Sequence, residues 1–488
     1  MEKMYQSTRN SNKKTTSKQA ILDGISRDGG LYVWPELDSV QLDLNKICKQ
    51  SYQENAVYIL KHLLADYSEE ELQDCVEKAY TNRFSNEKIT PIKKVGNTYV
   101  LELFHGPTSA FKDVALTLLP QLMQKALKTT SSKALILTAT SGDTGKAALA
   151  GFQDVENIGI EVFYPHNKVS AIQYRQMATQ EGNNVKVFAV KGNFDDAQSQ
   201  VKKLFLDEEL NNYCKEHNIL LTSANSINVG RLVPQIVYYF EAYKYLVNEH
   251  VIQMGDKISF SVPTGNFGDV LAGYYGYLMG LPVKKFYVAS NANKVLTDFL
   301  TTGIYDRNRD FIQTISPSMD ILISSNLERL LYYMCGKDTK QVAEWMNQLK
   351  ETGKYNVGPV MLEKLQSLFA CGYVEDDTTR QVIKEVEAAY NYVLDPHSAI
   401  AYEVAKKEEG VVVSLATASP YKFSQDVMQA LGKPEEDGWK AMEALEKICQ
   451  DATPVPLKRL KTQEILHKDV IAIAEMKQVV RKGCDELL

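Results

Sequence analysis

The chain has 488 residues, of which 44% are apolar and 24% are charged, and its formal net charge is −6. This length exceeds what one compact core usually supports, so we expect at least two domains with a cleft between them. The composition is that of an ordinary soluble globular protein. The net negative charge and the lack of a dense basic stretch argue against DNA or RNA as partners.

The sequence shows no feature of export, membrane insertion or metal binding. Residues 1–19 are polar and lack the apolar core of a secretory signal. No run of about 18 apolar residues could cross a bilayer. We therefore expect a soluble, cytoplasmic protein. The seven cysteines are scattered and odd in number, and the seven histidines lack metal-ligand spacing, so neither a disulfide framework nor a metal site is predicted.

The predicted elements change character along the chain. Up to about residue 90 the sequence predicts short helices, such as 55–64 and 69–80. From residue 97 onward, short apolar runs alternate with longer segments of helical period. Such runs are typical of strands that are buried on both faces and joined by right-handed helical crossovers. The predicted strands are 99–104, 133–140, 160–165, 185–190, 218–223, 257–265, 284–290 and 410–417.

This alternation indicates an α/β fold with mostly parallel sheets, although spacing alone fits either one large sheet or two smaller ones. The four evenly spaced runs between 134 and 222 favour a small domain inserted into a larger one, and so two parallel-sheet domains with an interdomain cleft. The predicted parts are an N-terminal helical region (1–92), a large α/β domain (93–132 and 231–435), a small inserted α/β domain (133–230) and a C-terminal helical extension (436–488).

Ligands of open α/β sheets bind where strands end and helices begin. Residues 138–148 leave a strand through small and hydroxyl residues and then open a helix, whose free N–H groups attract a phosphate or carboxylate. This segment is not a Walker loop, because Thr140 and Ala147 stand where that motif requires glycine and a hydroxyl residue. The alternative is a turn that only connects strand to helix.

Residues 261–270 form a second loop of this kind. Gly265 and Gly268 bracket a turn that can aim several backbone N–H groups at one phosphate. Asp269 would repel that phosphate unless its carboxylate points elsewhere, for instance to cap the helix. Two such loops in one α/β chain are stronger evidence for an anionic ligand than either loop alone.

A third loop, residues 101–112, places Lys112 near the start of a helix that Thr108 could cap. The helix macrodipole disfavours a cation at this position. Apolar neighbours such as Phe111, together with the positive partial charge, should lower the pKa of the Lys112 amine and make it nucleophilic toward an aldehyde. The alternative is a solvated surface lysine beside Asp113.

Residues 105–116 (HGPTSAFKDVAL) resemble the lysine motif of pyridoxal-phosphate enzymes of the tryptophan-synthase-like fold, and most closely that of the threonine synthase family. The resemblance ends near residue 423, and nothing specific is recognised after residue 433. It implies pyridoxal phosphate bound in the large domain, and conversion of O-phosphohomoserine and water to threonine and phosphate. Further segments that resemble the family, in its order, are 5–10, 27–33, 140–149, 223–239, 263–274, 316–331, 394–402 and 414–423.

The resemblance also implies roles for residues around the cofactor. Lys112 would bind the cofactor aldehyde and then act as a general base at the substrate. Thr417 would face the pyridine nitrogen, where a hydroxyl leaves that nitrogen largely unprotonated. The residues implied to hold the cofactor phosphate are Gly265, Asn266, Phe267, Gly268 and Asp269.

The substrate side is implied to consist of Ser141, Asp143 and Thr144, with Arg231 as the candidate for the substrate phosphate. An ion pair at a helix start is the alternative role for Arg231. Two rival functions share these motifs: a phospho-lyase that releases 2-oxobutyrate from the same substrate, and a relative that has lost catalysis. The sequence leaves monomer and homodimer open.

Overall fold

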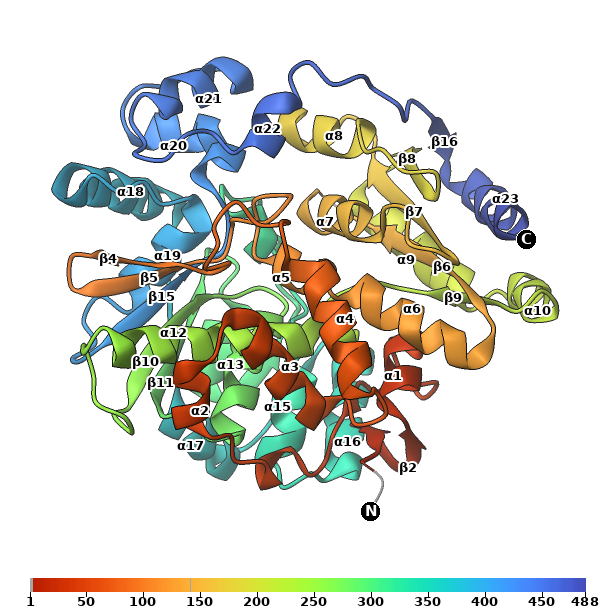
Figure 1. Ribbon diagram of the computed structural model, residues 1–488, viewed down its shortest axis with the longest axis horizontal. Coiled ribbons are helices and arrows are strands. Elements are labelled where there is room, and N and C mark those ends of the chain that lie inside the picture. Colours follow the sequence, from red (N-terminus) through yellow and green to blue (C-terminus); the bar gives the residue numbers. More distant parts are fainter. Residues whose placement is uncertain (1–2, 141) are drawn as a thin grey trace.

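The structure is a computed structural model that describes residues 3–140 and 142–488. It has two parallel sheets, which lie on opposite sides of the view in Figure 1, with α5 and α7 between them. All eight predicted strands are present. The predicted α/β fold with two parallel sheets and helical terminal parts is therefore confirmed, whereas the residue ranges of the four parts stay a prediction.

The large sheet has the strand order β14-β11-β10-β15-β5-β4 and is parallel except for β4, which pairs antiparallel with β5. Its central strands are buried on both faces, which is why they form continuous apolar runs. The strands are β4 (Ile92–Val95), β5 (Thr98–Glu102), β10 (Ile258–Pro263), β11 (Val283–Ser290), β14 (Phe369–Tyr373) and β15 (Val412–Ala416).

Helices surround this sheet, and a separate two-stranded antiparallel sheet of β12 (Ile304–Asp306) and β13 (Lys354–Asn356) lies beside them. The helices of this part are α5 (Lys112–Leu116), α6 (Leu119–Thr130), α11 (Val229–Leu232), α12 (Ile236–Asn248), α13 (Gly268–Leu278), α14 (Val295–Thr302), α15 (Leu327–Met334), α16 (Thr339–Thr352), α17 (Pro359–Leu368), α18 (Asp376–Tyr390), α19 (Pro396–Val404) and α20 (Ser424–Ala430).

The small sheet has the order β16-β8-β7-β6-β9 and is parallel throughout. Its strands are β6 (Lys133–Ala139), β7 (Ile158–Pro165), β8 (Val185–Lys191), β9 (Ile219–Thr222) and β16 (Val470–Ala472). Its helices are α7 (Asp143–Phe152), α8 (Ala171–Ala178), α9 (Phe194–Phe205), α10 (Glu208–Glu216) and α23 (Met476–Leu487).

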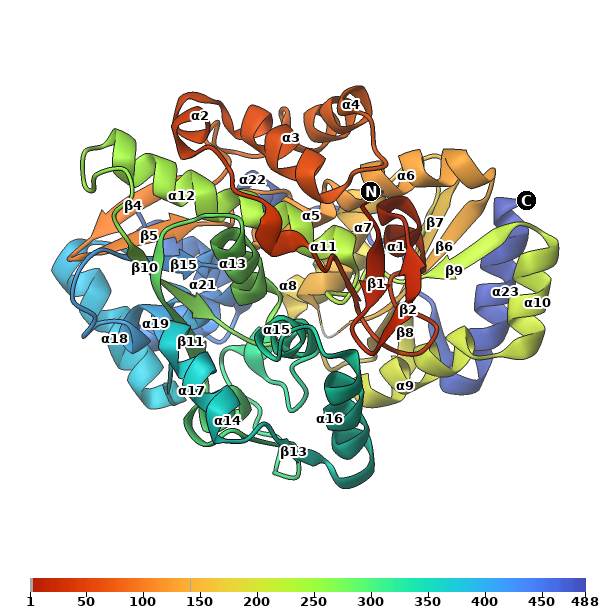
Figure 2. The same ribbon diagram turned by 90° about the horizontal axis from the view of Figure 1, so that it is seen from below.

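Both terminal parts are helical, and both also contain strands that the sequence pattern did not predict. The C-terminal part contains α21 (Gly438–Glu446) and α22 (Val455–Arg459), but residues 464–469 form no helix and residues 470–472 form β16, which pairs with β8. Tertiary pairing overrides helical periodicity there. The N-terminal part holds a sheet of order β2-β1-β3, and Figure 2 shows α2 to α4 along one side of the molecule. Its elements are β1 (Tyr5–Ser7), β2 (Asn10–Thr15), β3 (Tyr32–Val33), α1 (Ser17–Asp23), α2 (Leu44–Lys49), α3 (Tyr52–Leu63) and α4 (Glu69–Tyr80).

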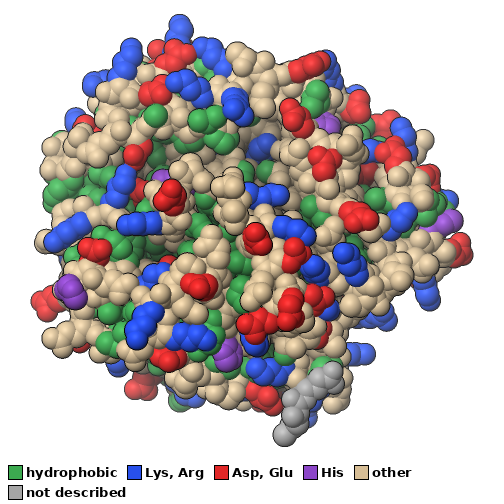
Figure 3. Space-filling model, in the orientation of Figure 1, with side chains coloured by type: hydrophobic (Ala, Val, Ile, Leu, Met, Phe, Trp, Pro, Cys, Tyr) green, Lys and Arg blue, Asp and Glu red, His purple; other side chains and the backbone are tan. Residues whose placement is uncertain are grey.

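The surface agrees with the ordinary composition. Lysine and arginine side chains are interspersed with aspartate and glutamate over the face that Figure 3 shows, without a continuous basic area. Among the described residues, none of the helices combines the length and the apolar character that crossing a membrane would require.

Helix α7, which lies against the central strand β7 of the small sheet, packs closely on α5. A Cβ atom at Gly151 of α7 would lie 1.9 Å from the carbonyl oxygen of Leu116 in α5. The backbones of these two helices therefore approach each other only because residue 151 has no side chain. Since α5 begins at Lys112 and α7 begins at Asp143, this contact also sets how close those two residues lie.

We expect Gly151→Ala to destabilise the protein by about 1–3 kcal/mol, because overpacking must push the two helices apart. The matched control is Gly276→Ala in α13, where the nearest atom to an added Cβ lies 3.4 Å away. The control should stay within about 1 kcal/mol of wild type, since alanine also favours a helix. Urea or thermal unfolding measures both. Equal stability of the two variants would contradict the close contact.

Glu161 of β7 should make the stability of the folded protein depend on pH. Its side chain is buried beneath α23, and both carboxylate oxygens lack a hydrogen-bond partner among the described residues. Burial raises the pKa of Glu161 from 4.5 to about 8. Above pH 4.5 the unfolded chain ionises while the folded chain keeps its proton, so this residue costs roughly 1.4 kcal/mol of stability per pH unit up to about pH 8.

Glu161→Gln should therefore raise the melting temperature at pH 8 more than at pH 5, because the glutamine does not ionise. The exposed neighbour Glu156 provides the matched control, and Glu156→Gln should show no such pH dependence. A gain from Glu161→Gln that is the same at both pH values would rule out the buried titration.

Candidate functional site

The turn before α5 is built around Asp113, contrary to the expectation that Thr108 caps the helix. Both the backbone N–H and the hydroxyl of Thr108 donate to the Asp113 carboxylate, at 2.8 and 2.5 Å. The N-cap position is taken by Phe111, without a side-chain hydrogen bond. The predicted cap is therefore wrong. The reason is that Asp113, already inside the helix, folds its carboxylate back onto the turn.

This turn also pairs with the chain that follows β15. The N–H of Phe111 donates to the carbonyl of Thr417 (2.8 Å), and the N–H of Ser419 donates to the carbonyl of Ser109 (3.1 Å). An isolated antiparallel bridge joins the residues between them. The structure thus brings Thr417 beside Lys112 and places both at the carboxyl ends of neighbouring strands β5 and β15.

Lys112 is buried, with only 9% of its surface exposed, which contradicts the alternative of a solvated lysine. Its Nζ lies 3.4 Å from Oγ of Ser318 and 3.7 Å from Oδ2 of Asp143. Burial, together with the positive charges of Lys422 and Arg231, lowers the pKa of Lys112 to about 8 against the opposing effect of Asp143. Near neutral pH this amine can both accept and donate a proton.

Asp143 lies between two ammonium groups. Its Oδ1 is 2.8 Å from Nζ of Lys422, whose side chain is buried, and its Oδ2 faces Lys112. Burial alone would raise the pKa of Asp143, but the two lysines hold it well below its usual range. Asp143 is therefore ionised and neutralises part of the positive charge around Lys112.

The first predicted anion loop is partly occupied by its own side chains. The hydroxyl of Thr140 accepts from the N–H groups of Gly142 and Gly145, both at 3.0 Å. Two donors that the sequence offered to a ligand are thus bonded within the loop. Thr144 lies beside Asp143 in the first turn of α7 and is half-buried, whereas Ser141 lies outside the described residues.

The second predicted loop leaves its donors free. Phe267 has φ +60° and precedes the first residue of α13, so successive N–H groups at this helix start point outward. In the described chain, no protein acceptor bonds the N–H groups of residues 265–269. A Cβ at Gly265 would lie 2.6 Å from the carbonyl oxygen of Ser318, so only glycine fits there. The loop can hold a phosphate.

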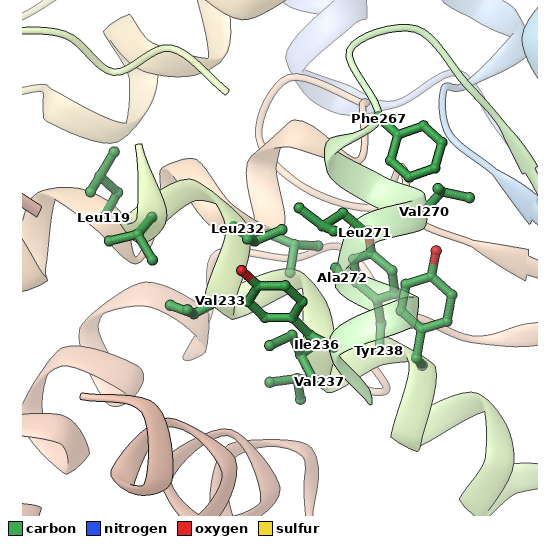
Figure 4. Packing of buried hydrophobic residues seen from close by; sticks show 14 of the residues in the cluster. Leu119, Leu232, Val233, Ile236, Val237, Tyr238, Phe267, Val270, Leu271 and Ala272 are labelled. Atoms are coloured by element: carbon green, nitrogen blue, oxygen red, sulfur yellow. The ribbon is translucent and has the colours of Figure 1, made fainter. Parts of the chain in front are cut away.

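Asp269 does not disturb this loop, because its carboxylate points away from it. The hydroxyls of Tyr238 and Tyr239 in α12 donate to Oδ1 at 2.5 and 2.9 Å. Figure 4 shows Tyr238 and apolar residues of α12 facing α13. Burial raises the pKa of Asp269 to about 6, although the two tyrosines oppose the shift. The carboxylate of Asp269 thus accepts hydrogen bonds from α12. It does not cap α13, which was the role considered from the sequence.

Arg231 is 3% exposed, and its Nη1 donates to the carbonyl of Ala224 (2.7 Å). Its Nε has no partner, and no carboxylate among the described residues forms an ion pair with it. The ion pair considered from the sequence is therefore not formed. Burial lowers the pKa of this guanidinium. A buried cation without a counter-ion is costly, which favours an anionic ligand as its partner.

Sequence reasoning missed Lys422, Ser318 and His397. Each lies inside a segment that resembles the family, but its residue type alone carries no signal. Lys422 forms an ion pair with Asp143, and the Ser318 hydroxyl accepts a hydrogen bond from Lys112. His397 contacts the backbone of Ser318, as described below.

The lowered pKa of Lys112 can be tested in the cofactor-free protein. Competitive acetylation followed by mass spectrometry should show reactivity of Lys112 rising with a midpoint near pH 8. Asp143→Asn should move this midpoint to lower pH, because the carboxylate stabilises the ammonium form. Exposed Lys128 serves as the internal reference in each digest. A midpoint that rises in Asp143→Asn would contradict the assigned electrostatics.

Three family models match the chain in order. A model described as "Threonine synthase N terminus" matches residues 4–80, "Pyridoxal-phosphate dependent enzyme" matches 87–372, and "Threonine synthase, C-terminal" matches 398–471. The central match covers more than half of the chain, including Lys112 and the loop 265–269.

Known proteins give the same result. The chain is 37% identical to threonine synthase-like 1 of Macaca fascicularis, over 96% of this chain and 65% of that relative. It is 38% identical to threonine synthase of Eremothecium gossypii, over 89% of this chain and 91% of that protein. The crystal structure of pyridoxal-phosphate-bound threonine synthase from Brucella melitensis superposes with a TM-score of 0.88, at 36% identity and over 99% of both chains. The chain thus belongs to the threonine synthase family of pyridoxal-phosphate-dependent enzymes.

Proposed function

We propose that this chain is a threonine synthase that converts O-phosphohomoserine and water to threonine and phosphate with pyridoxal phosphate. The observation that carries this proposal is the excess of buried positive charge beside Lys112. Lys112, Lys422 and Arg231 are all buried, whereas Asp143, which pairs with the two lysines, and Asp113 supply two negative charges. A substrate with a phosphate and a carboxylate would supply the missing negative charge.

The residues present fit pyridoxal phosphate. The Lys112 amine has the burial and the lowered pKa that bonding to an aldehyde requires. The free N–H groups at residues 265–269 are placed for the cofactor phosphate. Both backbone groups of Thr417 are already bonded, to Ser398 and Phe111, so its hydroxyl is the group left for the pyridine nitrogen. When bound, this cofactor delocalises the negative charge that develops on an amino-acid substrate.

The side chains around the cofactor then have separate proposed roles. Lys112 moves protons at the substrate carbons, since its pKa of about 8 suits both directions of transfer. Asp143, fixed by Lys422, orients the Lys112 amine. Arg231 binds the substrate phosphate through its free guanidinium face. Ser141 and Thr144 complete the proposed substrate side, and the proposed compartment is the cytoplasm.

An assay of the purified protein with O-phosphohomoserine and pyridoxal phosphate tests the proposal. Threonine and phosphate should appear in equal amounts, and Lys112→Ala should abolish turnover while the protein still folds. Release of 2-oxobutyrate without threonine would identify a phospho-lyase instead. No turnover by the protein under any of these conditions would identify a relative that has lost catalysis.

Arg231→Gln should lower kcat/KM for O-phosphohomoserine by roughly 10- to 100-fold, because each charge-assisted bond to a phosphate contributes about 1.5–3 kcal/mol. Steady-state kinetics with the cofactor at saturation measure the effect. The matched control is Arg459→Gln, an exposed arginine of α22, which should leave kcat/KM unchanged. An Arg231→Gln variant with normal kcat/KM would remove Arg231 from the substrate site.

A further inference from the structure

The turn Pro317–Met319 lies at the open side of Lys112. Oγ of Ser318 is the acceptor 3.4 Å from Nζ of Lys112, and the carbonyl oxygen of Ser318 faces Gly265. Ser318 is exposed while Lys112 is buried. The position of this turn therefore determines which polar groups lie next to the Lys112 amine.

His397 holds this turn by its backbone. The N–H of Ser318 donates to Nε2 of His397 at 3.2 Å, and Nδ1 of the same ring is 2.6 Å from Oδ2 of Asp395. Because Nε2 accepts a hydrogen bond, the ring is neutral and its proton lies on Nδ1, where it is donated to Asp395. His397 and Asp395 are 2% and 1% exposed, so water does not compete for these bonds.

Asp395 is in turn fixed on several sides. It accepts from the backbone N–H of His397 (3.0 Å), from that of Ser398 (3.1 Å) and from the Ser398 hydroxyl. The same hydroxyl accepts from the N–H of Thr417 at 3.2 Å. The His397 ring also packs on Phe423, with a centroid distance of 4.9 Å. One buried carboxylate thus connects Thr417 on one side of the site with Ser318 on the other.

We propose that His397, oriented by Asp395, is a positioning residue that keeps Ser318 against Lys112 and so fixes the Lys112 amine. The kinetic part of this inference rests on the proposed function, whereas the structural part does not. A residue that only filled space would need neither an acceptor at Nε2 nor a carboxylate at Nδ1.

Two substitutions at position 397 separate these roles. In His397→Gln the amide oxygen reaches the position of Nε2 and can still accept from Ser318. In His397→Asn the shorter side chain reaches only the position of Nδ1, so the Ser318 N–H loses its acceptor. Both variants are neutral and polar, which makes glutamine the rescue control for asparagine.

The first measurement is the acetylation of Lys112 in the cofactor-free protein. His397→Asn should move the midpoint to lower pH by up to about one unit, because the ammonium loses the Ser318 acceptor. His397→Gln should keep the wild-type midpoint. The second measurement is the kinetics of the holoenzyme, where His397→Asn should lower kcat roughly tenfold with KM nearly unchanged, and His397→Gln should restore most of it.

Ser318→Ala provides a second variant at an exposed position, in case His397→Asn fails to fold. It should shift the Lys112 midpoint in the same direction as His397→Asn, and the double variant should add nothing further. Equal behaviour of the asparagine and glutamine variants would overturn the proposal, and so would an unchanged midpoint in Ser318→Ala.

The two proposals fail separately. If the holoenzyme makes no threonine but the midpoint shifts as expected, the proposed function is wrong and the positioning role stands. If threonine forms and the midpoint does not move in either Ser318→Ala or His397→Asn, only the positioning role is wrong.

Discussion

The carboxylate of Asp143 lies between the ammonium groups of Lys112 and Lys422, and these three residues come from α7, α5 and the turn after β15. Without Asp143, the ammonium groups of Lys112 and Lys422 would lose the carboxylate between them, and their repulsion would favour the neutral amine of Lys112. The pairing of the turn before Lys112 with residues 417–419, and the contact of Gly151 with α5, both bring this carboxylate to its place. The site therefore depends on the contact between α7, which follows the small sheet's β6, and the turns that follow β5 and β15 of the large sheet.

The balance of charge explains why the two anion loops behave differently. The loop before α7 bonds its own donors through Thr140 and supplies a fixed carboxylate. In the loop before α13, the carboxylate of Asp269 accepts hydrogen bonds from two tyrosines of α12, and the N–H groups of the loop stay free. Two loops of similar composition thus differ in charge, because one presents a carboxylate and the other presents N–H groups. This difference follows from the direction in which the aspartate side chain of each loop points.

Much of the fold was predictable from the sequence, because most of the eight main strands are largely buried on both faces and so form nearly continuous apolar runs. The strands that were missed lack this signal. β2 reads NSNKKT and is largely exposed, and β16 has only three residues within a segment of helical period. β2 forms by pairing with β1, a few residues earlier in the chain, whereas β16 forms by pairing with β8, which lies far away in the sequence.

The same limit applies to the site. The burial of Lys112 and the free N–H groups of residues 265–269 agree with what their residue types indicated, whereas their roles stay predictions. The cap by Thr108 was predicted wrongly because the competing group, Asp113, lies inside the helix. Lys422 and His397 acquire their roles only from neighbours 279 and 79 residues away, Asp143 and Ser318.

The edge strand β16 and helix α23 have a consequence for biosynthesis. β8 stays an open edge of the small sheet until residues 470–472 have left the ribosome, and the groups around Glu161 stay uncovered until α23 docks. An open parallel edge invites pairing with other chains. Until residues 470–487 dock, the chain is therefore prone to pair with other chains through β8, and any delay in that docking would prolong the exposure.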